Sequence, residues 1–201
     1  MTSRTSISIF GSANLSGSVD YHQQINQLGR TLASLEVDIQ LGSTTGLLDC
    51  FLQGAHSWRN AQTWRTSHSW KEAQDPNNKL KQSSTINLVM YGDSRYTTTE
   101  YIDQLITKPC YFTRLSLLCD ADIFIVLDGQ LGTMAETIVS WNQLQANQDF
   151  DKKIIIFGQQ ESRKLHFLLE SFTFSKPAYQ QLVYFADTVE DIIKMIPTNP
   201  H

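Results

Sequence analysis

The sequence predicts a single Rossmann-like α/β domain, in which a parallel sheet is flanked by helices. Short apolar runs alternate along most of the 201 residues with segments whose apolar residues recur at helical spacing. Such alternation is typical of parallel sheets built from right-handed crossovers. Turns rich in small residues follow three of the apolar runs, as in α/β proteins that bind ligands at the carboxyl edge of the sheet.

The first unit of this pattern lies near the N-terminus. Residues 7–10 form an apolar run that we predict to be a strand, and Gly11 and Ser12 follow it directly. A helix is expected over 19–35, because its apolar residues share one face. Residues 37–41 then predict a second strand, so the chain begins with a strand–helix–strand unit.

A second turn of small residues runs from Gly42 through Ser43 and Thr44 to Gly46. It opens a helix that we expect to end near Gly54. Between 56 and 85 the alternation lapses, and we interpret this polar stretch as an insertion in the single domain 1–201. The insertion contains three tryptophans, some of which we assign to a dimer contact: Trp58, Trp64 and Trp70.

The rest of the chain continues the alternation. Further strands are expected over 86–90, 123–127, 153–157 and 182–185, and a last helix over 189–195. The run 123–127 is short, β-branched and wholly apolar, which is typical of a strand buried on both faces.

The most informative segment follows that buried strand. Gly129, Gly132 and Thr133 lie in a turn between the strand and a segment of helical periodicity. Unpaired N–H groups and the helix dipole favour an anion at such a helix start, most often a phosphate. Glu136 falls in the first turn of this helix, where it either complements the dipole or acts on a bound ligand.

Composition and charge limit the possible functions. The formal net charge of −4 argues against a nucleic-acid-binding surface. No apolar run reaches membrane-spanning length and no signal-peptide pattern is present, so we expect a cytoplasmic protein that contacts no membrane. The three cysteines lack metal-ligand or C-x-x-C spacing, and we interpret them as reduced core residues without a catalytic role: Cys50, Cys110 and Cys119.

The three small-residue turns should meet at one crevice if their strands are neighbours. Their backbone N–H groups and hydroxyls suit a phosphate and a ribose. No G-x-G-x-x-G follows the first strand and no G-x-x-x-x-G-K-[ST] loop is present, which argues against NAD, FAD or ATP. The candidate phosphate and ribose ligands are Gly11, Ser12, Gly42, Ser43, Thr44, Gly129, Gly132 and Thr133. We expect no metal and no cofactor.

These segments, in this order, resemble the LOG (Lonely Guy) family of cytokinin riboside 5′-monophosphate phosphoribohydrolases, often misannotated as lysine decarboxylases. The similarity covers residues 7–141 and rests on the opening strand with Gly11-Ser12, on 28–33, on 42–55, and on Gly129-x-x-Gly132-Thr133-x-x-Glu136. The resemblance implies a Rossmann-like domain that binds a nucleoside monophosphate, releases the free base and ribose 5-phosphate, and forms a homodimer.

The chain departs from the family pattern at the site. Asp128 replaces the family's proline, Gln130 replaces its second glycine, and the loop at Gly42 keeps one glycine of three. The family's Arg-Lys pair matches Arg114-Leu115 only with a shift of one residue. Either the helix is one residue shorter, or Thr113 occupies the arginine position; a surface role for Arg114 stays open.

The resemblance assigns catalytic roles to two residues. Glu136 would stabilise the oxocarbenium character that develops on the ribose and orient the attacking water. Arg114 would bind the phosphate or assist departure of the base. Arg95, in the loop after 86–90, is an alternative anion ligand, although an ordinary turn explains that loop as well.

Two other classes of function stay open. A nucleoside deoxyribosyltransferase-like enzyme shares an L-D-G and a downstream G-T-x-x-E, although its spacing is longer. A non-catalytic binder of a nucleotide-like ligand, such as a molybdenum-cofactor carrier, is also consistent with the altered glycines. For any of these we expect a homodimer with Trp141, on the helix after Glu136, in the interface.

Overall fold

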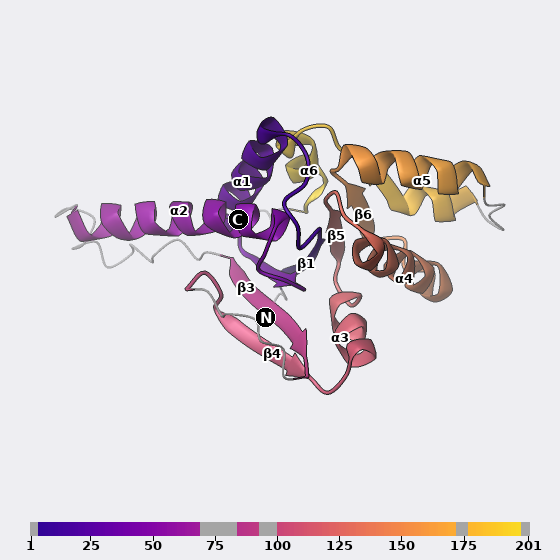
Figure 1. Cartoon of the computed structure of the whole chain (residues 1–201), viewed down its shortest axis with the longest axis horizontal. Coiled ribbons are helices and arrows are strands. Elements are labelled where there is room, and N and C mark those ends of the chain that lie inside the picture. The colour runs from indigo at the N-terminus through magenta and orange to yellow at the C-terminus, as the bar shows by residue number, and fades with distance from the viewer. Residues whose placement is uncertain (1–3, 69–83, 93–99, 172–176, 198–201) are drawn as a thin grey trace.

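The computed structural model describes residues 4–68, 84–92, 100–171 and 177–197. Seven strands form one sheet in the order β4-β3-β2-β1-β5-β6-β7, and every neighbouring pair is parallel (Figure 1). The strands are β1 (Thr5–Phe10), β2 (Val37–Leu41), β3 (Thr85–Tyr91), β4 (Gln104–Lys108), β5 (Ile123–Val126), β6 (Lys153–Ile156) and β7 (Val183–Phe185). The predicted α/β class with a parallel sheet is therefore confirmed.

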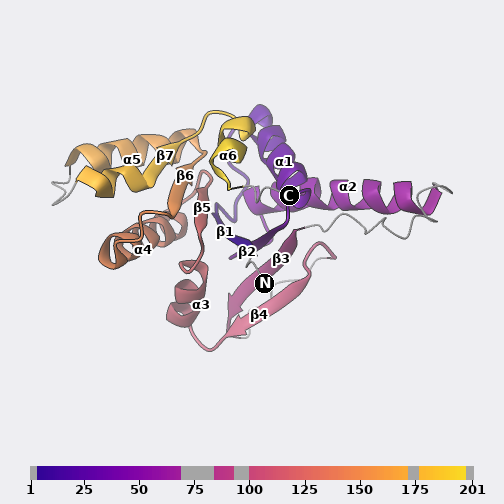
Figure 2. The same cartoon turned by 180° about the vertical axis from the view of Figure 1, so that it is seen from behind.

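Six α-helices and a short 3-10 helix connect the described strands. They are α1 (Val19–Ala33), α2 (Leu47–His68), α3 (Tyr111–Leu118), α4 (Leu131–Asn147), α5 (Gln159–Ser171), η1 (Pro177–Leu182) and α6 (Val189–Met195). Seen from the two opposite sides in Figure 1 and Figure 2, α1, α2 and α6 gather at one end of the molecule and α4 and α5 at the other.

The alternation of side chains along the strands divides the core into two parts. Ile7 and Ile9 of β1 pack with apolar residues of α1, α2 and α6 on one face of the sheet. Phe10 and Phe124 lie in the other part, with residues of α4 and α5. All four residues of β5 are buried, as expected for a central parallel strand with helices on both faces.

The predicted end of the second helix near Gly54 is wrong, because α2 continues to His68. Gly54 does not stop the helix but lets it approach α1: a Cβ on Gly54 would overlap the carbonyl of Asn26, and one on Gly29 of α1 would overlap the carbonyl of Phe51. The far half of α2 extends beyond the sheet in Figure 1 and Figure 2.

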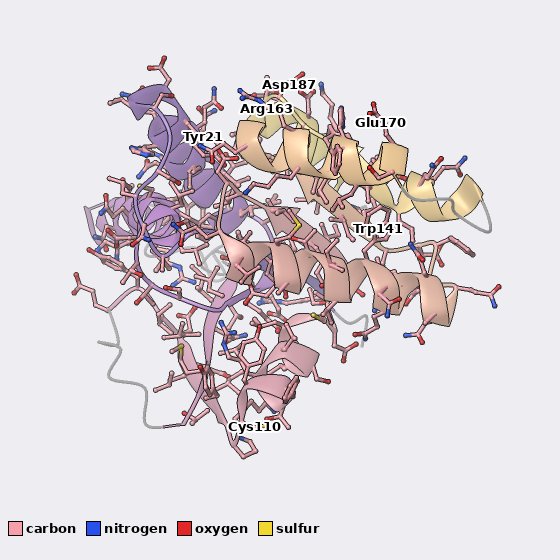
Figure 3. The ribbon with its side chains drawn as sticks, turned by 45° about the vertical axis from the view of Figure 1, so that its right-hand side comes forward. Tyr21, Cys110, Trp141, Arg163, Glu170 and Asp187 are labelled. Atoms are coloured by element: carbon pink, nitrogen blue, oxygen red, sulfur yellow. The ribbon has the colours of Figure 1, made fainter. Side chains whose placement is uncertain are left out.

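The structure describes only some of the tryptophans that we considered for a dimer contact. Trp58 packs against the core of its own domain, whereas Trp70 and the side chain of Trp64 lie outside the described residues. Trp141 is only 4% exposed and packs inside the domain; Figure 3 shows it between α4 and α5. The expectation that Trp141 supplies a dimer contact is therefore wrong, because its ring is already buried within the chain.

One strand was not predicted from the sequence. β4 lies at the edge of the sheet beyond β3, and its residues are exposed or half-buried. An edge strand of this kind carries polar residues and lacks the continuous apolar run that marks a central strand.

Candidate functional site

A cavity of about 540 Å³ opens at the carboxyl edge of the sheet. The strand order runs from β1 towards β4 on one side and from β1 to β5 on the other, so the loops after β1 and β5 diverge here, as at the ligand-binding crevice of open α/β sheets. The cavity is lined by the ends of β1, β2 and β3, by the first turn of α3 and by the first two turns of α4. The prediction that Glu136 falls in the first turn of its helix is wrong, because α4 begins at Leu131 and Glu136 lies in its second turn.

Most of the candidate residues meet at this cavity. The lining includes eight of the ten that the sequence suggested: Gly11, Ser12, Gly42, Ser43, Arg114, Gly132, Thr133 and Glu136. The other two, Thr44 and Gly129, are not among the described lining residues. Thr44 is buried, and the carbonyl of Gly129 accepts a hydrogen bond from Lys164 Nζ at 2.9 Å. Arg95 lies outside the described residues.

The start of α4 is open towards the cavity. The N-cap residue, Gln130, makes no capping hydrogen bond with its side chain among the described residues. The N–H groups of Leu131, Gly132 and Thr133 have no acceptor within the helix because they belong to its first turn. A Cβ on Gly132 would meet no described atom within 4 Å, so this glycine borders empty space that a ligand can occupy.

The central feature of the cavity wall is an ion pair between Arg114 and Glu136. Arg114 Nη1 lies 3.3 Å from Glu136 Oε1, and the two side chains are 9% and 12% exposed. Arg114 also donates from Nε to the carbonyl of Val89 at 3.0 Å and from Nη2 to the carbonyl of Gly42 at 2.8 Å. Arg114 is thus a buried residue of the site and not a surface arginine.

The neighbouring positions explain this placement of Arg114. Thr113 is exposed, and its hydroxyl donates to the carbonyl of Cys110 at 2.9 Å, so Arg114 is the residue of this helix that reaches Glu136. A Cβ on Gly42 would overlap the Arg114 guanidinium. Gly42 therefore lets the arginine cross close to the backbone of this loop.

Burial changes the acidity of the Glu136 carboxyl group. Its pKa is raised above the usual value, because the loss of solvation outweighs the opposing influence of the Arg114 charge and hydrogen bond. A carboxylate with a raised pKa beside a cationic guanidinium can stabilise a developing positive charge and exchange a proton with a bound water or ligand.

Sequence reasoning missed two aromatic residues of the cavity, Tyr91 at the end of β3 and Tyr111 at the start of α3. Their rings meet edge to face with centroids 5.7 Å apart. Burial and the nearby Glu136 charge raise the pKa of the Tyr111 phenol. Tyr111 precedes Arg114 by three residues, and this i, i+3 spacing on one helix face was the available signal.

Asp128, which stands where the family pattern has a proline, has a structural role. The buried Asp128 Oδ1 accepts a hydrogen bond from the N–H of Gln160, in the first turn of α5, at 2.8 Å. Gly158 permits this contact, since a Cβ there would overlap the carboxylate. The N–H of Asp128 donates to Tyr21 Oη at 2.9 Å. Asp128 therefore anchors the loop before α4 to α1 and α5.

A second cavity, of about 790 Å³, lies at the same edge on the side of β6 and β7. Its wall includes Tyr21, Asp128, Arg163 and Asp187, and Figure 3 shows Tyr21, Arg163 and Asp187 close together where α1 and α5 begin. This cavity contains none of the candidate residues that the sequence suggested.

The cysteines agree only in part with the expectation of core residues. Cys119 is buried, Cys50 is half-buried and Cys110 is exposed; Figure 3 places Cys110 at the far end of the molecule from α5, where α3 begins. Burial raises the pKa of the Cys119 thiol, which accepts a hydrogen bond from Ser140 at 3.2 Å. Cys119 is thus a packed residue behind α4.

The fold and the cavity define a Rossmann-like α/β protein with a cavity at the switch point of its sheet. Among solved structures, the molybdenum cofactor binding protein of Rippkaea orientalis is similar, with a TM-score of 0.64 and 17% identity over 97% of this chain and 96% of that one. The molybdenum cofactor carrier protein of Chlamydomonas reinhardtii has a TM-score of 0.63 and 17% identity over 96% and 95%.

A third similar structure belongs to DNA processing protein A of Helicobacter pylori, with a TM-score of 0.55 and 15% identity over 94% of this chain and 79% of that one. At these identities the similarity shows the fold alone. Comparison with protein-family models and with curated protein sequences yields no match.

Two searches of the described residues complete the description. No helix in the described ranges is both long and apolar enough to cross a bilayer. Likewise, no cluster of three or more His, Cys, Asp or Glu side chains in that part of the chain could hold a metal ion.

Proposed function

We propose that this protein hydrolyses the N-glycosidic bond of a nucleoside 5′-monophosphate and releases the free base and ribose 5-phosphate. The observation that carries the proposal is the buried Glu136 carboxylate, paired with Arg114 and lining the cavity that the open start of α4 also faces. This combination provides an anion site and a charge for a cationic transition state in one cavity.

The order of groups along α4 fits such a substrate. The N–H groups at Gly132 and Thr133 would bind the 5′-phosphate. Glu136 follows one turn later, about 5 Å further along the helix axis, and it lines the same cavity. A ribose whose phosphate is bound at the helix start would therefore have its anomeric carbon near the carboxylate.

The reaction needs only water and the side chains of this site. The C1′–N bond breaks and its electron pair leaves with the base, while a water oxygen bonds to C1′ and one water proton passes to the base. Glu136 would stabilise the cation at C1′ and orient the water. Arg114 donates to two backbone carbonyls as well as to Glu136, so its proposed role is to position Glu136.

Product analysis tests this function. The wild-type protein incubated with AMP should release adenine and ribose 5-phosphate, and Glu136→Gln should lower the rate by about two to three orders of magnitude. Glu170→Gln is the matched control, because Glu170 is an exposed residue of α5 remote from the cavity. Equal rates for wild type and Glu136→Gln would overturn the catalytic assignment, and base exchange in place of hydrolysis would indicate a transferase.

A second candidate function is the binding of a nucleotide-like ligand without turnover, as in a molybdenum-cofactor carrier. One similar structure is described as a molybdenum cofactor binding protein and another as a molybdenum cofactor carrier protein, and Glu136 is held by Arg114 within this protein. A wild-type protein that binds AMP in calorimetry but releases no base would favour this candidate. Co-purification of a fluorescent oxidised pterin would support it further.

We further propose that the protein forms a homodimer near the cavity. Leu131 and Phe112 are 84% and 77% exposed, and each adjoins a residue that lines the cavity, Gly132 or Tyr111. Apolar residues at such positions suit the core of an interface. Light scattering should show a dimer that Leu131→Glu dissociates, whereas a monomeric wild type at micromolar concentration would contradict it.

A further inference from the structure

We propose that Tyr91 and Tyr111 form the subsite for the base, so that the ligand of this cavity carries a planar aromatic heterocycle at the end opposite its phosphate. The proposal rests on the proposed function, since it starts from a phosphate bound at the start of α4. It adds a specificity-determining pair that the glycine loops and Glu136 do not reveal.

The cavity has a direction that follows from its walls. Gly132 and Thr133 line it at the start of α4, and Glu136 lines it one turn further along the same helix. Beyond Glu136 lies Arg114, at 3.3 Å, and Tyr111 shares its helix face with Arg114. A nucleoside monophosphate has the same order of parts, from phosphate to sugar to base, so the base falls beside the tyrosines.

Tyr111 is suited to contact the base directly. Its phenol is close enough to Glu136 and Arg114 for both charges to act on it, and burial raises its pKa, so it keeps its proton at neutral pH. A protonated phenol can donate a hydrogen bond to a ring nitrogen. Because Tyr111 and Glu136 line the same cavity, this donor would face the base of a ligand whose sugar lies at Glu136.

Tyr91 provides a second aromatic surface at the mouth of the cavity. It is 44% exposed, yet it lines the cavity and meets the Tyr111 ring edge to face at 81°. A large aromatic side chain left this open to solvent is a typical platform for a planar ring. Together the two rings form a corner that a flat heterocycle can fill.

Comparison of two ligands tests the proposal. Affinities for AMP and for ribose 5-phosphate, which lacks the base, are measured by calorimetry in the Glu136→Gln background, where AMP is turned over too slowly to disturb the titration. The proteins compared are Glu136→Gln alone and Glu136→Gln combined with Tyr91→Ala, Tyr111→Ala or Tyr111→Phe. We expect each alanine variant to lose about tenfold in AMP affinity and to keep its affinity for ribose 5-phosphate. Tyr111→Phe should keep the stacking and lose only the contribution of the hydroxyl.

Tyr184→Ala is the matched control, since Tyr184 is a strand tyrosine of similar exposure (37%) in β7, at the other side of the sheet. Equal losses for both ligands would show a structural role for the tyrosines and overturn the subsite, and so would unchanged AMP affinity. If the Glu136→Gln parent binds ribose 5-phosphate but gains nothing from the base of AMP, the subsite is wrong while the phosphate site stands. If it binds neither ligand, the proposed function fails as well.

Discussion

Among the helices that begin at the carboxyl edge of this sheet, α1, α5 and α4 differ in what satisfies their first N–H groups. At α1, Ser18 Oγ accepts from the N–H of Tyr21 at 3.2 Å. At α5, the Asp128 carboxylate accepts from the N–H of Gln160 at 2.8 Å. At α4, the side chain of Gln130 makes no capping bond within the described part of the chain.

This difference in helix capping distinguishes the two cavities, which lie at the same edge of the sheet. The cavity at α1 and α5 is the larger of the two, but one first-turn N–H group of each helix is already bound by a side chain of the protein. The smaller cavity at α4 keeps unpaired N–H groups and faces a buried ion pair. Because capping removes donors that an anion would use, cavity size alone does not decide which of the two cavities suits an anion.

The largest expected effect concerns the ion pair that distinguishes the α4 cavity. Arg114→Ala leaves Glu136 buried without its partner and should lower the free energy of unfolding by about 3–5 kcal/mol at neutral pH, measured by urea denaturation. Adding Glu136→Gln to Arg114→Ala removes the stranded charge and should restore part of the loss. A double variant as unstable as Arg114→Ala would show that the arginine acts through packing and its carbonyl contacts alone.

The next effect concerns the open space at the start of α4. A Cβ at position 132 would have no described atom within 4 Å, so Gly132→Val places a side chain in the open space where the phosphate would lie. We expect ribose 5-phosphate affinity to fall at least about tenfold, or about 1.4 kcal/mol, while the protein stays folded by circular dichroism. Unchanged affinity would place the anion elsewhere in the cavity.

Smaller effects are expected where the helix starts are capped. Ser18→Ala and Asp128→Ala should each lower the free energy of unfolding by about 1 kcal/mol, with Asp128→Ala the larger because its carboxylate is buried. In Ser18→Ala the affinity for ribose 5-phosphate should not change. Loss of affinity in Ser18→Ala would mean that the two cavities are not independent.

The smallest expected effect concerns pH, because burial and Arg114 act on Glu136 in opposite directions. The ionised carboxylate is the active form in the proposed reaction, and a raised pKa means that ionisation requires a higher pH. The acid limb of kcat should therefore lie above the usual pKa range of a glutamate, about 4.3. A limb at or below that value would show that the arginine prevails over burial.

The sequence predicted the strands that form the centre of the sheet because burial on both faces leaves a continuous apolar run, as in Ile123–Val126. It did not predict β4, whose edge position permits polar residues. Gly54 was misread as a helix end because a glycine in a close helix crossing and a glycine at a terminus look alike in sequence.

Within the site, the glycine loops and Glu136 could be proposed from spacing, whereas the position of Arg114 could not. A shift of one residue changes the side of a helix on which a residue lies by about 100°, and only the packing of α3 against the sheet decides between the two. Asp128 was recognised as a departure from the family pattern, but its partner Gln160 is 32 residues away.

The contacts of Arg114 join three segments that are distant in sequence. Its guanidinium reaches the carbonyl of Gly42 after β2, the carbonyl of Val89 in β3 and the carboxylate of Glu136 in α4. The cavity wall therefore exists only when all three segments have docked on α3. Ligand binding would then require a fully folded domain. A bound ligand would therefore stabilise the whole domain by mass action. It would also slow proteolysis, because cleavage would need the whole domain to open.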